Sequence, residues 1–76
     1  MDVSKYKIEI THHAFVQAMR RGIHPDIIED ALLKGKTKKY GKNGIKFINK
    51  GSKRTIICVG QIEGIKIKIF TVEEKI

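Results

Sequence analysis

The chain has 76 residues, one cysteine and a formal net charge of +8. Its length predicts one small domain over residues 1–76, and a single cysteine excludes an internal disulfide. No apolar run approaches the roughly 20 residues that cross a bilayer, and no apolar signal region follows the first residue. We therefore expect a cytoplasmic protein that does not contact a membrane.

The positive charge is concentrated in the middle of the sequence. Between Ala31 and Ile62 there is no acidic residue, and this segment holds Lys34, Lys36, Lys38, Lys39, Lys42, Lys46, Lys50, Lys53 and Arg54. Such a block attracts phosphates without regard to nucleotide sequence. The alternative is a solvated lysine-rich face, as in heat-adapted proteins.

The first third of the chain predicts a strand and a helix. Residues 6–10 alternate apolar and charged side chains, which indicates a half-buried strand. Thr11 is a favourable helix cap and Gly22 a favourable helix stop. Between them an apolar stripe at helical spacing is expected to be buried in the core, and it consists of Ala14, Phe15, Ala18 and Met19.

A second helix is expected to start at Pro25, because proline is favoured at the first helical position. Asp26 suits the positive end of the helix dipole. Ile27, Ile28, Ala31 and Leu32 form the apolar stripe, and Gly35 follows the helix.

The rest of the chain predicts a meander of four strands, at residues 36–40, 45–49, 54–60 and 65–72. Asn43-Gly44 is a strong hairpin signal between the first two. The third is the most apolar and should be central. In the last, we expect Ile65, Ile67, Ile69 and Thr71 to share one face. The predicted fold class is α+β, with an N-terminal strand and two helices packed on one face of a four- to five-stranded antiparallel sheet.

The first helix carries the candidate chemistry at both of its ends. His12 and His13 occupy its first positions, where free N–H groups and the dipole favour an anion. A neutral imidazole there could accept a proton from a ribose 2′-hydroxyl. Arg20 and Arg21 lie at the other end, and Arg21 is about 12 Å along the axis from His13. A surface or boundary role for the histidines, and a favourable helix-end role for one arginine, are the structural alternatives.

Candidate partners for this helix come from the sheet. Arg54 precedes the central strand, and Thr71 should reach the edge of the core near a helix end. Arg54, Lys53, Lys46 and Arg20 are the candidate RNA phosphate-binding residues. We predict no metal ion and no cofactor, because the histidines and Cys58 lack the spacing of paired ligands. Cys58 is expected to be a small core residue.

Nearly the whole chain resembles the family called domain of unknown function 4258. The resemblance rests on Thr11, on His13-Ala14, on Met19 with Arg21-Gly22-Ile23, on Asp26-Ile27-Ile28 with Gly35, and on Ile69-Phe70-Thr71-Val72. That family is similar to the RelE/ParE and BrnT toxins, within the barnase-, EndoU-, colicin- and RelE-like folds. Gln17 stands where the family often has an arginine.

The resemblance implies a metal-independent ribonuclease, acting as the toxin of a toxin–antitoxin pair. It implies that His13, Arg21 and Thr71 are the catalytic residues and that RNA and an acidic antitoxin are the partners. In this mechanism His13 removes the 2′-hydroxyl proton, while Arg21 and Arg54, with Lys53 near, stabilise the phosphoryl oxygens and Thr71 positions a phosphate oxygen or the imidazole. The competing hypothesis is a non-catalytic module that binds RNA or DNA, or docks the antitoxin, through its basic block.

Overall fold

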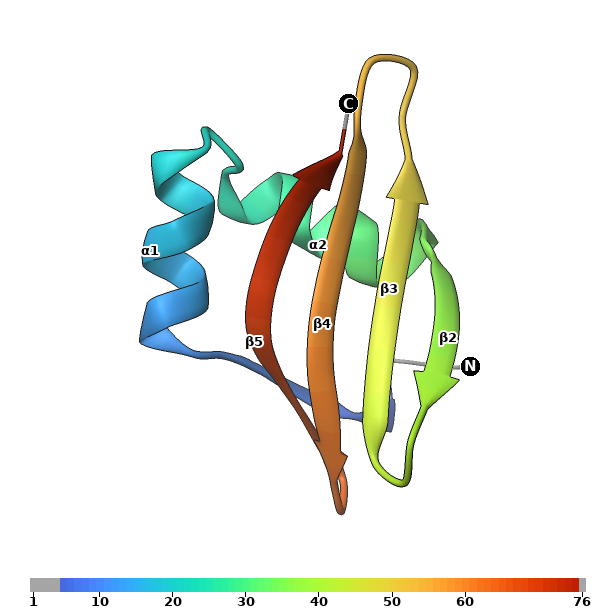
Figure 1. The fold of residues 1–76 in the computed structure, drawn as a ribbon. Coiled ribbons are helices and arrows are strands. Elements are labelled where there is room, and N and C mark those ends of the chain that lie inside the picture. The colour runs from blue at the N-terminus through green and yellow to red at the C-terminus, as the bar shows by residue number, and fades with distance from the viewer. Residues whose placement is uncertain (1–4, 76) are drawn as a thin grey trace.

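One five-stranded sheet with two helices against it makes up the described part of the chain, residues 5–75, in a computed structural model (Figure 1). The α+β architecture agrees with the predicted fold class. In chain order the elements are β1 (Lys7–Ile10), α1 (His12–Arg20), α2 (Pro25–Lys34), β2 (Lys36–Tyr40), β3 (Gly44–Lys50), β4 (Thr55–Glu63) and β5 (Lys66–Lys75).

The sheet is mixed, whereas the sequence predicted an antiparallel one. Its strand order is β1-β5-β4-β3-β2, and β2 to β5 form the predicted antiparallel meander with β4 at the centre. β1 instead pairs parallel to β5, with Lys7 opposite Lys66 and Ile10 opposite Ile69. Parallel neighbours require a long connection, and here it contains both helices and the other three strands. An alternating pattern shows which face of a strand is buried and carries no information on its direction.

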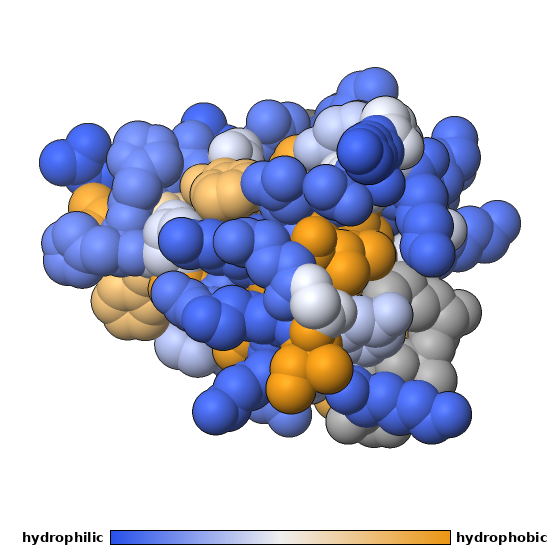
Figure 2. All heavy atoms as spheres, turned by 90° about the horizontal axis from the view of Figure 1, so that it is seen from below, coloured by the Kyte–Doolittle hydropathy of each residue, from blue (hydrophilic) through white to orange (hydrophobic). Residues whose placement is uncertain are grey.

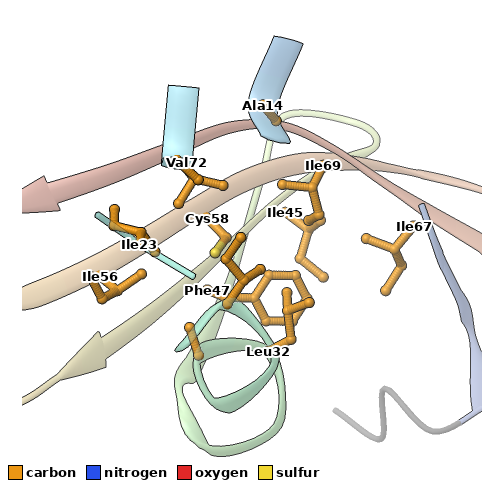
Figure 3. Packing of buried hydrophobic residues seen from close by; sticks show 13 residues of the cluster. Ala14, Ile23, Leu32, Ile45, Phe47, Ile56, Cys58, Ile67, Ile69 and Val72 are labelled. Carbon is orange, nitrogen blue, oxygen red and sulfur yellow. The ribbon is translucent and has the colours of Figure 1, made fainter. Parts of the chain in front are cut away.

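The core lies between the helices and one face of the sheet. Figure 3 shows its side chains meeting around Phe47, with Ile45, Cys58, Ile69 and Val72 among its labelled members. The strands contribute Ile45, Phe47, Ile56, Cys58, Ile67, Ile69 and Val72, and the helical region contributes Ala14, Ala18, Ile23, Ile28, Ala31 and Leu32.

The predicted helix boundaries are confirmed. The Thr11 hydroxyl accepts from the Ala14 N–H at 3.1 Å, which satisfies a free donor of the first turn. Gly22 adopts a φ of 71°, a left-handed conformation that glycine takes without steric cost. Pro25 is at the start of α2, where its missing N–H costs nothing.

The apolar stripe of α1 is narrower than predicted. Ala14 and Ala18 are fully buried, but Phe15 and Met19 are 42% and 41% exposed, so the assignment of these two residues to the core is wrong. The helix packs along β5 near the edge of the sheet, where two alanines suffice for close contact. The sheet offers no further surface there to cover the larger side chains.

The last strand contains a β-bulge that the sequence did not predict. Val59 pairs with Thr71 and Gly60 pairs with Ile69, which leaves Phe70 as the extra residue. Beyond the bulge the alternation is shifted, so Val72 is fully buried and Thr71 faces the other side with Val59. The predicted shared face of Thr71 with Ile67 and Ile69 is therefore wrong. Ile65 lies in the turn before β5 and is 76% exposed.

We call the side of the sheet opposite the helices the open face; in Figure 1 it is turned toward the viewer. None of the described residues covers it. The strand register places on it Lys7 and Glu9 of β1, Lys36, Lys38 and Tyr40 of β2, Gly44, Lys46, Ile48 and Lys50 of β3, Thr55, Ile57, Val59, Gln61 and Glu63 of β4, and Lys66, Lys68, Phe70, Thr71, Glu73 and Lys75 of β5.

Neither helix in residues 5–75 has the length and apolar character needed to span a membrane. From below, the surface shows separate hydrophobic patches surrounded by hydrophilic residues (Figure 2).

Cys58 should react with thiol reagents only when the protein unfolds. The side chain is fully buried, and burial raises the pKa of its thiol to about 11, so the reactive thiolate is scarce. We expect slow reaction with Ellman's reagent at mildly alkaline pH and fast reaction in denaturing urea. Fast stoichiometric labelling of the native protein would contradict the buried placement.

Candidate functional site

The candidate site is a groove along the exposed side of α1. It is lined by His12, His13, Val16, Gln17, Arg20 and Arg21, and we call it the α1 groove. Its residues form two rows with a spacing of four, one through His12 and one through His13. That spacing stacks side chains on one side of a helix. The groove therefore has imidazoles at one end and guanidiniums at the other.

The local sequence explains the position of both ends. Thr11 starts the helix, so His12 and His13 are in its first turn, where the backbone dipole is positive. Arg20 is in the last turn, and Arg21 is the C-terminal cap residue, where a cation is favourable. The structure thus brings three predicted site residues, His13, Arg20 and Arg21, into one groove.

Gln17 and Arg21 connect this groove to the edge of β5. The Gln17 side-chain oxygen accepts from the Val72 N–H at 3.2 Å, and Arg21 Nη1 donates to the Val72 carbonyl at 3.4 Å. β1 pairs only with the first part of β5, up to Ile69. Beyond that point, the two side chains replace a neighbouring strand at Val72.

Arg21 is consequently directed toward β5. His13 and Arg21 are eight residues apart, about 12 Å along the helix. With its guanidinium at Val72, Arg21 does not reach back to His13. One phosphate cannot contact both residues in this arrangement.

Thr71 is outside the α1 groove. It is adjacent to Val72 in sequence, but the bulge directs its side chain to the open face. The expectation that Thr71 emerges at the core edge beside the helix was based on uninterrupted alternation and is wrong.

The remaining predicted cations are distributed over other parts of the molecule. Arg54 Nη1 is 2.5 Å from Glu74 Oε2, in an ion pair between the start of β4 and the end of β5. Lys53 is exposed in the turn before β4. Lys46 is on the open face, with its ammonium 5.7 Å from the centre of the Tyr40 ring. These three residues do not join the α1 groove.

Two polar groove residues, His12 and Gln17, are not among the predicted site residues. His12 was considered with His13 but was not assigned a catalytic role, and Gln17 was noted only as a departure from a family pattern. Both were detectable, because His12 is eight residues before Arg20 and Gln17 lies midway between His13 and Arg21.

Within residues 5–75, no three His, Cys, Asp or Glu residues are grouped so that they could hold a metal ion.

In comparisons with known proteins, no family model, curated protein or solved structure matches the chain, so the family resemblance remains a prediction.

Replacing Gln17 by leucine should lower the free energy of unfolding by about 1 kcal/mol, because the Val72 N–H loses its acceptor. Gln17→Glu is the matched control, since it keeps an acceptor oxygen at the same position. Urea denaturation measures both. Equal stability of the leucine variant and the wild type would show that the contact does not hold α1 to β5.

The Arg54–Glu74 pair should stabilise the fold independently of any ligand. Both side chains are partly buried, with exposures of 34% and 21%. A double-mutant cycle with Arg54→Gln and Glu74→Gln should give a coupling free energy of about 1 kcal/mol, reduced by added salt. Zero coupling at low salt would leave Arg54 free for phosphate binding.

Proposed function

We propose that the protein is a metal-independent endoribonuclease that cleaves RNA by attack of a 2′-hydroxyl on the adjacent phosphate. The observation that carries this proposal is the α1 groove, in which two histidines and two arginines share one helix side. Imidazoles suit proton transfer near neutral pH, and guanidiniums suit phosphate binding. The net charge of +8 favours a polyanionic substrate.

The proposed reaction takes place at the histidine end of the groove. His13 accepts the 2′-hydroxyl proton as the oxygen bonds to phosphorus. The bond from phosphorus to the 5′-oxygen breaks, and His12 donates a proton to that leaving oxygen. The products are a 2′,3′-cyclic phosphate and a 5′-hydroxyl. The positive end of the α1 dipole stabilises charge on the phosphoryl oxygens.

Arg20 and Arg21 have a binding role in this scheme. They lie too far from His13 to contact the same phosphate, so they would hold another phosphate of the same strand. This differs from the expectation that Arg21 stabilises the reacting phosphate. Thr71 and Arg54 are outside the groove and take no part in the proposed step.

The resemblance to the RelE/ParE and BrnT toxins extends the proposal to a toxin–antitoxin pair. An acidic antitoxin would be attracted to the lysines of the central block. Co-purification with the acidic product of a neighbouring reading frame would support this extension. Activity that such a protein does not inhibit would contradict it.

The second candidate function is a non-catalytic module that binds RNA or DNA. The lysines of the open face favour it, since they provide a positive surface apart from the histidines. The dependence of cleavage on His13 discriminates between the two functions.

His13→Ala should reduce RNA cleavage by at least about 100-fold, as expected for loss of a general base. His24→Ala is the matched control, because His24 is exposed, lies outside the α1 groove and makes no side-chain capping bond at α2. Cleavage of a labelled single-stranded RNA is followed by gel, with detection of the cyclic phosphate and with EDTA present.

Circular dichroism should show the same fold for both variants. Equal loss of cleavage in the His13 and His24 variants, or no cleavage by the wild type on any RNA tested, would remove the enzyme proposal and leave the binding module.

A further inference from the structure

The open face has a hollow at the end where the β2–β3 turn lies. It is an open depression of about 380 Å³, bordered by two aromatic side chains, Tyr40 from β2 and Phe70 from β5. This volume is at the lower end of the range of about 300–1,000 Å³ that is typical of small-molecule sites. The hollow is separate from the α1 groove, with which it shares no residue.

Glycine at position 44 determines where the Tyr40 ring lies. A Cβ on Gly44 would lie 2.6 Å from Cε2 of Tyr40, so the tyrosine ring rests directly on the β3 backbone. Gln61, the cross-strand partner of Gly44, adds an amide to the lining of the hollow. The hollow therefore combines flat apolar walls with a group that can hydrogen-bond the edge of a ring.

Both aromatic side chains are partly exposed, Tyr40 by 47% and Phe70 by 37%. The Lys46 ammonium lies 5.7 Å from the centre of the Tyr40 ring, so a base that stacks on this ring also meets a cation. Phe70 is the bulge residue and has no partner across the sheet. Bulges often re-aim a side chain beside a functional site.

The charges around the hollow favour an anionic chain. Lys38 and Lys46 are directly opposite each other on neighbouring strands, a repulsive arrangement that an anion between them would relieve. Lys42, in the β2–β3 turn, lines the hollow itself. Lys68 is opposite Gln61, but its other neighbour, on β1, is the acidic Glu9. A ligand that enters here thus meets most of the positive charge on the side of β2 and β3.

We infer that the hollow between Tyr40 and Phe70 binds an unpaired base of a single-stranded RNA whose phosphates lie on the open-face lysines. A base in a duplex has its faces covered by its neighbours, whereas an unpaired base can stack on an aromatic side chain. The inference rests on the proposed function only for the choice of RNA, because the site itself does not require cleavage.

The test uses 2′-O-methylated RNA of about ten nucleotides, a length within the range bound by single-strand modules. This RNA lacks the free 2′-hydroxyl, so binding is measured without cleavage. Fluorescence anisotropy at one salt concentration compares the single strand with its duplex. We expect Tyr40→Leu and Phe70→Ala each to weaken single-strand binding about ten-fold, the loss of one stacking contact.

Tyr40→Phe should bind like the wild type, because it keeps the ring. Phe15→Ala is the aromatic control, since Phe15 is similarly exposed but lies on α1, away from the hollow. Duplex binding should be the same for all variants.

Two results would overturn the inference. The first is that Tyr40→Leu and Phe15→Ala weaken single-strand binding equally. The second is that the Tyr40 and Phe70 variants change self-association, or binding of an acidic protein, and leave RNA binding unchanged. If cleavage depends on His13 but RNA binding does not depend on Tyr40, the proposed function stands and the base-binding role of the hollow fails. If RNA binding depends on Tyr40 but no cleavage occurs, the base-binding role stands and the proposed function fails.

Discussion

Strand β5 has one residue more than its partner β4 can pair, and this residue determines what both faces of the sheet present. Because Phe70 has no partner, Val72 enters the core while Thr71 joins Phe70 on the open face. The neighbouring strand adapts to this geometry with Gly60, where a Cβ would collide with the Lys68 carbonyl. The buried packing and the exposed aromatic surface therefore depend on the same irregularity.

The bulge also affects the position of α1. Val72 is the residue whose backbone hydrogen-bonds Gln17 and Arg21, so the attachment of the helix begins where the regular alternation ends. β1 no longer pairs with β5 at this residue, and α1 lies beside β5 instead. The α1 groove is thus supported by main-chain groups of the sheet, which limits the movement of its arginine end.

The sequence was informative where structure depends on neighbouring residues. Thr11, Gly22 and Pro25 set the helix boundaries through local rules, and Asn43-Gly44 marked the hairpin. The parallel direction of β1 and the bulge at Phe70 depend on pairings between distant segments, which periodicity does not encode. Residues 65–69 alternate regularly, and this pattern gave no sign that the buried face changes before Val72.

The candidate site, too, could be predicted from the sequence only where it depends on neighbouring residues. His13 and Arg21 could be placed on one helix side by counting residues. The Arg54–Glu74 pair and the contact of Gln17 with Val72 join residues far apart in the chain, so no local pattern announced them. Because of these long-range contacts, only those predicted site residues that line the α1 groove lie together.

β2 lies at the outer edge of the sheet, and three of its five residues are lysines. An unpaired edge strand is a template for pairing with another copy of the chain, and repeated positive charge opposes such pairing. The lysines of β2 thus oppose edge-to-edge pairing whether or not a ligand is bound. Chemical neutralisation of these amines would favour aggregation through β2 as well as weaken attraction to anions.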